Sequence, residues 1–296
     1  MKYIIDKTNE KISIKDFLKR EKVSTNLLKR LKKIPNGIQV NSKHENVNYL
    51  LKENDVLELL SEDFYDDENE YLEPLNVPLD IIYEDENITV INKPSNMPTH
   101  ESLNNRGNTL ANALRYRYLN KPYVFRATNR LDKDTSGVVI TANNRYYASL
   151  LSSKIKKGEI KKEYIAVVMG RLEGEGLINA PIDRIEKSII KRVVRDDGEE
   201  AITKYKSLVA CDEASVILLS PITGRTHQLR VHLSHISHPI IGDILYGENS
   251  DYINRQALHC LKMDVKDIGC FYAPLPEDVR SLIRNYFDNE EFVPKS

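Results

Sequence analysis

The chain is organised around one stretch, Phe125-Arg-Ala-Thr-Asn-Arg-Leu-Asp-Lys-Asp-Thr-Ser-Gly-Val-Val-Ile140. It passes through Asp132 into Thr135-Ser136-Gly137, and then into an apolar run, Val138-Val139-Ile140, that predicts a buried strand. The pattern therefore puts one carboxylate on a turn at the end of a sheet. An aspartate before Thr-Ser-Gly can also simply cap a turn by bonding its own backbone. The stretch alone leaves both interpretations open.

Composition predicts a globular protein with a strongly partitioned charge. Of the 296 residues, 41% are hydrophobic and 29% are charged, which is enough for a packed core. Residues 1–60 carry 13 Lys/Arg against 8 Asp/Glu, and residues 61–86 carry 11 Asp/Glu with no Lys or Arg. Residues 87–296 carry 30 Lys/Arg against 25 Asp/Glu. Two basic segments separated by an acidic one can both face a polyanion. An ordinary solvated surface would give the same numbers.

The cysteines and the hydropathy indicate a cytoplasmic protein. Cys211, Cys260 and Cys270 are widely spaced and form neither a disulfide framework nor a zinc pattern. No run approaches the roughly 18 apolar residues of a membrane helix, and the first residues do not resemble a signal peptide. We therefore expect no contact with a membrane.

Residues 1–62 are expected to form a small unit of their own, followed by an acidic linker over residues 63–78. Ser13 or Asp16 can cap a first helix, and a second helix is predicted over residues 24–33 with lysine and arginine outside. Strands are predicted at residues 38–40 and 56–60. Two short helices followed by a small hairpin resemble the S-four-like RNA-binding module of ribosomal proteins.

Residues 79–296 are expected to form the second, larger domain. Strands alternate there with a few helices, as the following segments indicate: strands at 79–84, 88–92, 161–170, 201–210 and 214–220; helices at 109–120, 143–157, just after Gly224 and from Pro276; and a basic hairpin or loop within 178–206. This order predicts an α+β fold.

Six segments resemble the RluA-type family of pseudouridine synthases, in the family's order. Arg130-Leu-Asp-Lys-Asp-Thr-Ser-Gly137 is similar to its R-L-D-x-x-T-S-G signature. The others are Asn92-Lys-Pro-Ser-Asn-Met-Pro-Thr-His100, Lys162-Glu-Tyr164, Thr223-Gly-Arg-Thr-His-Gln-Leu-Arg-Val-His232, Gly242-Asp-Ile-Leu-Tyr-Gly247 and Arg255-Gln-Ala-Leu-His259. The resemblance covers about residues 80–275. It implies a bent, mixed and mainly antiparallel sheet with a central cleft for RNA.

The resemblance also implies the chemistry. Forming pseudouridine breaks the N-glycosidic bond of uridine and joins C5 of the base to C1′ of the same ribose. A carboxylate must attack C1′ or take a ribose proton, and the resemblance assigns this role to Asp132. It makes Arg225 the cation that keeps Asp132 ionised. Tyr164 is implied as the aromatic ring that stacks on the uracil and helps with the C5 proton.

A uridine in folded RNA must leave its stack to reach Asp132. Arg130 is expected to fill the gap with its planar guanidinium, and Leu229 to give the pocket apolar packing. Asn129 stands where the family commonly has His, so it can hydrogen-bond to backbone or base but cannot carry a proton. The remaining expected RNA contacts are Lys93, His100, Lys29, Arg30, Lys32 and Lys33.

Several alternatives stay open. Four histidines, His227, His232, His235 and His238, invite a zinc site but lack acidic or cysteine partners in register, so we expect neither metal nor organic cofactor. A base-removing hydrolase would need a second catalytic carboxylate. A non-catalytic RNA-binding protein would have no use for Asp132. Among RNAs, ribosomal RNA is favoured weakly over tRNA, and we expect a monomer.

Overall fold

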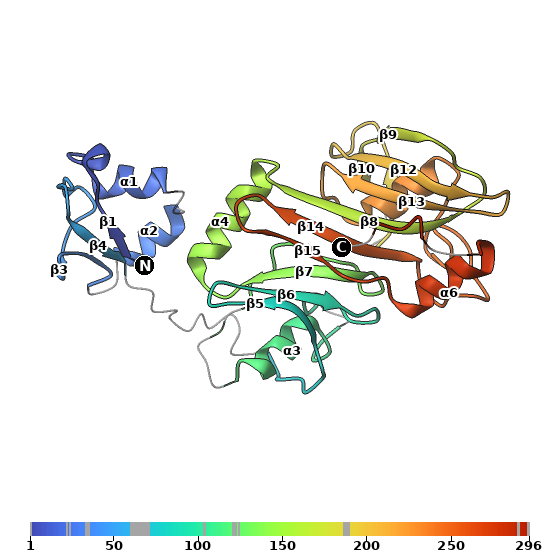
Figure 1. Cartoon of the computed structure of the whole chain (residues 1–296), viewed down its shortest axis with the longest axis horizontal. Coiled ribbons are helices and arrows are strands. Elements are labelled where there is room, and N and C mark those ends of the chain that lie inside the picture. Colours follow the sequence, from blue (N-terminus) through green and yellow to red (C-terminus); the bar gives the residue numbers. More distant parts are fainter. Residues whose placement is uncertain are drawn as a thin grey trace.

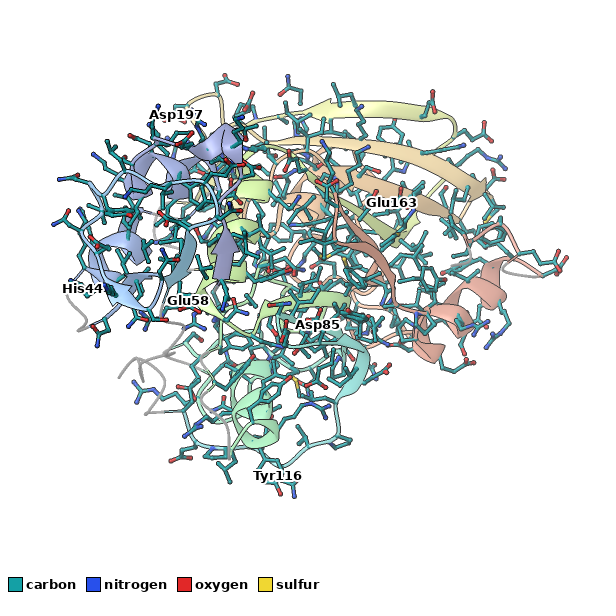
Figure 2. All side chains as sticks on the ribbon, turned by 60° about the vertical axis from the view of Figure 1, so that its left-hand side comes forward. His44, Glu58, Asp85, Tyr116, Glu163 and Asp197 are labelled. Atoms are coloured by element: carbon teal, nitrogen blue, oxygen red, sulfur yellow. The ribbon has the colours of Figure 1, made fainter. Side chains whose placement is uncertain are left out.

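The structure is a computed structural model of the chain. It describes residues 2–21, 23, 25–32, 36–59, 72–102, 105–119, 123, 125–185, 190–288 and 291–294, without the side chains of Asn26, Leu27 and Arg30. These residues form a small N-terminal unit and a larger one (Figure 1). In Figure 2, His44 and Glu58 mark the small unit, and Asp85, Tyr116 and Glu163 mark the large one.

The small unit has a sheet, two helices and a core of its own. Its strands are β1 (Lys2–Ile4), β2 (Ile38–Val40), β3 (Lys43–His44) and β4 (Val56–Leu59), in the antiparallel order β1-β4-β2-β3. After a 3-10 turn (η1, Lys7–Asn9) come α1 (Ile14–Arg20) and α2 (Thr25–Leu31). Ser13 is the cap of α1, because its hydroxyl accepts from the backbone N–H of Asp16. Strand β1, which pairs with β4, was not predicted from the sequence.

The large unit is built on one nine-stranded sheet of mixed direction. Its order is β5-β6-β7-β14-β8-β13-β12-β9, with β15 beside β14. Only β7 and β14 pair in parallel among the described strands; the other pairs are antiparallel. The bounds are β5 (Asp80–Glu84), β6 (Ile88–Lys93), β7 (Ser136–Ala142), β8 (Ile160–Met169), β9 (Glu175–Asn179), β12 (Ile202–Ala210), β13 (Ala214–Pro221), β14 (Leu258–Val265) and β15 (Gly269–Tyr272). The α+β expectation is confirmed.

Four helices and one hairpin accompany this sheet. The helices are α3 (Leu110–Arg117), α4 (Arg145–Lys156), α5 (Gln228–His235) and α6 (Glu277–Tyr286), and the hairpin pairs β10 (Ile182–Arg184) with β11 (Arg192–Val194). Thr109 and Asn144 cap α3 and α4 through their side chains. None of the described helices is long and apolar enough to cross a membrane.

Strand β7 lies at the centre of the core, and all seven of its residues are buried. The predicted apolar run Val138-Val139-Ile140 is fully covered, as in strands buried on both faces. Gly137 has a φ of +113°, and a Cβ there would come within 2.2 Å of the carbonyl oxygen of Cys260 on β14. Only glycine therefore lets β14 approach the start of β7 this closely.

Helix α4 lies on the side of the large unit that faces the small one (Figure 1). Tyr146 of α4 packs against the core of the small unit. Tyr3 of β1 stacks edge-to-face on Phe17, with ring centroids 5.4 Å apart. Burial, reinforced by the neighbouring Tyr146, raises the pKa of Tyr3 above its usual value. Tyr146 is thus one point of contact between the two units.

Candidate active site

Asp132 lies on a tight turn that leads into β7. The turn is closed by the backbone N–H of Thr135, which donates to the carbonyl of Asp132 over 3.1 Å. A second loop supports it, because Thr99 and Leu131 exchange two hydrogen bonds through the Thr99 hydroxyl. The Asp132 side chain keeps 28% of its surface exposed. The carboxylate is therefore fixed in place and still open to a substrate.

Arg230 is the cation that pairs with Asp132. Its Nη1 atom lies 3.1 Å from Oδ2 of Asp132. Its other face is bidentate on Asp243, with Nε–Oδ2 and Nη2–Oδ1 distances of 2.7 Å each. Asp243 is fully buried, and Oδ1 also accepts from the backbone N–H groups of Leu245 and Tyr246. Arg230 thus bridges a buried carboxylate and the exposed one.

The charge of Arg230 is secured by these partners. Burial alone would lower the pKa of Arg230, but the hydrogen bonds and charges of Asp243 and Asp132 raise it above its ordinary value. The guanidinium also lies over the ring of Tyr246, 5.1 Å from the centroid. Asp132 therefore faces a permanent positive charge.

The expectation that Arg225 pairs with Asp132 is wrong. The Nε of Arg225 donates to the carbonyl of Glu200 over 2.9 Å, and Nη1 pairs with the Glu199 carboxylate. The side chain is 39% exposed. The reason is the start of α5, which begins at Gln228, so Arg225 lies in the turn before the helix and Arg230 inside it. The same sequence segment supplied two arginines, and the helix start decides between them.

Tyr164 lies on β8 with its side chain buried against Cys260. Burial, then the charge and hydrogen bond of Cys260, raises the pKa of Tyr164 well above its ordinary value, and Asp132 adds to the effect. The phenol is therefore neutral and unsuited to act as a base.

Asn129 is a structural residue in place of the expected RNA contact. It is buried, its Nδ2 donates to the carbonyl of Val138 over 3.0 Å, and its Oδ1 accepts from Ile140 over 3.1 Å. Both ends of the amide are thus used to hold the Asp132 segment on β7. An amide satisfies one donor and one acceptor together, which explains why Asn fits a position whose family residue is commonly His.

Lys93 is also internal, contrary to the expected RNA contact. Its side chain is completely buried, and Nζ donates to the carbonyls of Pro94, Met97 and Lys133 over 2.8, 2.7 and 3.1 Å. Burial lowers the pKa of Lys93 to about 7, and the carboxylates of Asp132 and Asp134 oppose this. The three bonds tie the 94–97 loop to the turn beyond Asp132, which sequence hydropathy cannot reveal.

Arg130 and His100 remain exposed beside the turn. His100 packs edge-to-face on Phe125, with ring centroids 4.9 Å apart. Partial burial and then the charge of Arg130 lower the pKa of His100, so the two side chains are neighbours. Leu229 is buried in the main core. On the small unit Lys29 and Lys32 are exposed, whereas Lys33 and the Arg30 side chain fall outside the described residues.

Besides Arg230, three neighbours of Asp132 were not assigned from the sequence: His227, Asp243 and Tyr246. His227 Nε2 lies 3.7 Å from Oδ2 of Asp132. Asp243 and Tyr246 both belong to the Gly242-Asp-Ile-Leu-Tyr-Gly247 segment, so the motif itself was the available signal. No group of three or more His, Cys, Asp or Glu suited to a metal ion is found among the described residues.

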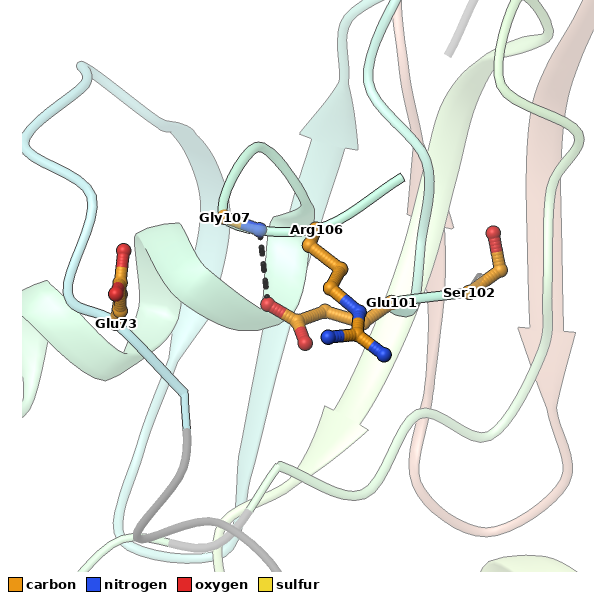
Figure 3. Close-up of a pocket in the computed structure, with 5 residues that line it drawn as sticks. All are labelled: Glu73, Glu101, Ser102, Arg106 and Gly107. Carbon is orange, nitrogen blue, oxygen red and sulfur yellow. Dashed lines mark hydrogen bonds between the residues drawn. The ribbon is translucent and has the colours of Figure 1, made fainter. Parts of the chain in front are cut away.

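A separate hollow lies beyond His100. Glu73, Glu101, Ser102, Arg106 and Gly107 line it (Figure 3). The backbone N–H of Gly107 donates to Glu101 over 2.9 Å, and Asn112 donates to the same oxygen. The carboxylate of Glu101 is thus occupied in holding its own loop. Asp132 is not among these residues.

Comparisons with known proteins agree with this geometry. Residues 87–235 match the model of a family described as RNA pseudouridylate synthase. The chain is 38% identical over 281 residues to "Uncharacterized RNA pseudouridine synthase YjbO" of Bacillus subtilis, covering 92% of this chain and 99% of that protein. It is 35% identical over 238 residues to "Ribosomal large subunit pseudouridine synthase D" of Escherichia coli, covering 73% of each.

A solved structure gives the same result. "Human RNA Pseudouridylate Synthase Domain Containing 1" superposes with a TM-score of 0.56 and 31% sequence identity, covering 69% of this chain and 86% of the human one. "Human RNA Pseudouridylate Synthase Domain Containing 4" gives a TM-score of 0.58 at 24% identity, which bears on the fold alone.

Proposed function

This chain belongs to the RNA pseudouridylate synthase family, and we propose that Asp132 is the carboxylate with which it acts on its target uridine. It is an enzyme that isomerises uridine in RNA to pseudouridine. The observation that carries the Asp132 assignment is the ion pair of this exposed carboxylate with Arg230, itself held by buried Asp243. A carboxylate must be ionised to attack C1′ or to take a ribose proton. Arg230 places a fixed positive charge beside this carboxylate.

The reaction needs the uridine outside its stack. Extrusion costs a few kcal/mol, which a side chain can offset by stacking in the gap. Arg130 is two residues from Asp132 and has an exposed guanidinium, so it is the side chain proposed for this role. The buried ring of Tyr164 and the side chain of Leu229 are proposed as the apolar contacts of the base.

The proposed substrate is ribosomal RNA. Relatives of 35–40% identity are named ribosomal large subunit pseudouridine synthase D, which favours it over tRNA. We further propose that residues 1–62 bind RNA, that 63–78 link the units, and that 79–296 are catalytic. The exposed Lys29 and Lys32 of the small unit suit phosphate contacts. We propose action in the cytoplasm, as a monomer, with no metal or organic cofactor.

The test is replacement of the carboxylate in the purified full-length enzyme. Asp132→Asn should abolish tritium release from RNA labelled at uridine C5 while RNA affinity stays within about threefold, because binding rests on phosphate contacts elsewhere. Asp134→Asn, two residues away, is the matched control and should keep near-normal activity. Turnover by Asp132→Asn would remove Asp132 from the proposed role.

The choice of RNA is tested in cells. Pseudouridines should be mapped in total RNA with the gene intact, deleted, and carrying Asp132→Asn. Sites in large-subunit ribosomal RNA that vanish in both altered strains would support the proposal. If pseudouridines were lost only from tRNA, the proposed ribosomal RNA substrate would be wrong and the pseudouridine synthase activity would still stand.

A further inference from the structure

We propose that His227 is a positioning residue for the reaction: its Nε2–H, fixed by Tyr246, restrains one oxygen of Asp132 so that the other faces the ribose. This inference rests on the proposed role of Asp132. The first supporting observation is that Nε2 of His227 lies 3.7 Å from Oδ2 of Asp132. The imidazole is largely buried, with 12% of the side chain exposed, and therefore has few other directions in which to donate.

The hydrogen bonds of Tyr246 select the tautomer. The backbone N–H of Arg192 donates to the Tyr246 hydroxyl over 2.8 Å, so that oxygen already accepts one bond. The Tyr246 hydroxyl lies 2.9 Å from Nδ1 of His227, so this nitrogen can accept the hydroxyl proton. Tyr246 therefore donates to Nδ1, and a neutral imidazole carries its own proton on Nε2. That proton points at the Asp132 carboxylate.

Arg230 and His227 face the same oxygen of Asp132. Arg230 Nη1 and His227 Nε2 face Oδ2, and Oδ1 has no hydrogen-bond partner within the described part of the chain. The carboxylate is thus held on one side and free on the other. A gap of 3.7 Å is longer than a hydrogen bond and can close when a substrate displaces the exposed carboxylate, as catalytic contacts often tighten on binding.

The backbone at His227 supports a specific role. Its φ of +57° is left-handed, a conformation that residues other than glycine adopt under strain. Although His227 occupies the cap position of α5, its side chain makes no capping bond. The imidazole is instead directed at Tyr246 and Asp132. Helix capping therefore does not account for it.

Charged groups of both signs face His227. They are Asp132 from the catalytic turn, Arg230 from α5, Arg192 from β11 and Asp243 from the following loop, while Lys191 lies 5.9 Å above the Tyr246 ring. Burial lowers the pKa of His227, Asp132 opposes this, and the two arginines add to the lowering. The neutral form thus prevails at neutral pH. An imidazolium would form a full ion pair with Asp132 and weaken it as a nucleophile or base.

The experiment compares three variants of the full-length enzyme on one RNA. His227→Asn tolerates the left-handed backbone and can accept from Tyr246, but its amide is too short to reach Asp132. His227→Gln can place an N–H where Nε2 lay. Tyr246→Phe keeps the ring over Arg230 and removes the hydroxyl. RNA affinity, kcat, KM and the pH profile of kcat are measured for each.

We expect His227→Asn to lower kcat about 10- to 100-fold, as for loss of one charge-assisted hydrogen bond, with KM within twofold. The kcat of His227→Gln should be at least threefold higher than that of His227→Asn. The wild-type kcat should fall in acid with an apparent pKa below 6.5, and this acid limb should be absent in His227→Gln. In Tyr246→Phe the limb should move to higher pH, because loss of the donated hydrogen bond no longer favours neutral imidazole.

Two results would overturn the inference. One is a kcat for His227→Asn within twofold of wild type. The other is equal loss in the Asn and Gln variants with the acid limb unchanged, as a purely structural role would give. Failure of the underlying assignment looks different: Asp132→Asn would then turn over RNA, whatever the His227 variants do.

Discussion

The Nη1 atom of Arg230 lies 3.1 Å from Oδ2 of Asp132, although 98 positions separate the two residues in the chain. The Nε and Nη2 atoms of Arg230 donate to Asp243, which no solvent reaches. The guanidinium is therefore oriented by a buried carboxylate on one side and presents one N–H to Asp132 on the other. The fixed fork of an arginine suits this double task, and the single ammonium of a lysine does not.

The two arginines of the Thr223–His232 segment should separate cleanly in kinetics. Arg230→Lys should lower kcat at least about 100-fold, since it breaks the bidentate bond to Asp243 and misplaces the charge beside Asp132. Arg225→Lys, the matched control on an exposed pair, should change kcat less than about threefold. Single-turnover assays at saturating enzyme measure both. An equal loss in the two variants would contradict the pairing of Arg230 with Asp132.

Asp243 should prove important for stability as well as for activity. Asp243→Asn leaves the buried Arg230 without its main counter-charge, and breaking one side of a buried pair costs about 3–5 kcal/mol. The free energy of unfolding from urea titration measures this. Asp197→Asn, which loses an exposed pair with Arg195, is the control and should keep the wild-type midpoint.

His259 should make the fold sensitive to acid. Its Nδ1 bonds Ser136 and its Nε2 bonds the carbonyl of Ala273, and burial lowers its pKa to about 4. In the unfolded chain the His259 imidazole is protonated near pH 6.5. Between pH 6.5 and 4 the unfolded chain therefore binds more protons than the folded protein. The contribution of neutral His259 to the free energy of unfolding is fully present above pH 6.5. About 3 kcal/mol of it is lost as the pH falls to 4.

The check is the difference between wild type and His259→Gln. Unfolding free energies at pH 7, 6, 5 and 4 should show a smaller acid loss in the variant, because its glutamine does not titrate. Comparing the two proteins cancels the contributions of the other histidines. Parallel curves would mean that His259 is not responsible for the acid loss.

Arg130 should matter only where a base must leave its stack. Arg130→Ala should lower kcat at least about tenfold on a uridine within a stem, and much less on an unstructured oligonucleotide, for which the extrusion cost is small. Arg171→Ala, which loses exposed pairs with Glu173 and Asp212, is the control. Equal losses on the two RNAs would point to phosphate binding by Arg130.

Local patterns predicted much of this fold. The apolar run Val138–Ile140 gave β7, the helices at 109–120 and 143–157 correspond to α3 and α4, and the segments at 201–210 and 214–220 form the β12–β13 hairpin. Each of these depends on hydropathy period and caps within a few residues. Strand β1 and the parallel pairing of β7 with β14 depend on partners far along the chain, which no local period records.

The sequence predicted the type of active site, but only some of the residues that form it. The segments around Asp132, Tyr164 and Arg230 were singled out, and the family implied by them is confirmed. Lys93 and Asn129 were expected among the RNA contacts. Both are buried with backbone partners that only the folded loop supplies. His227 was weighed only as a metal ligand, and its φ of +57° cannot be read from the sequence.

The position of β14 also has a consequence for protein synthesis. This strand lies between β7 and β8 in the sheet, yet it is translated more than 100 residues after β7. At roughly 5–20 residues per second, the ribosome leaves the sheet in two halves for on the order of 10 s, each with an open edge prone to wrong pairing. Arg230 is also synthesised in this interval, after β7 and before β14. A nascent chain is therefore not expected to modify RNA until β14 has been made, and chains cut short before residue 258 are predicted to aggregate.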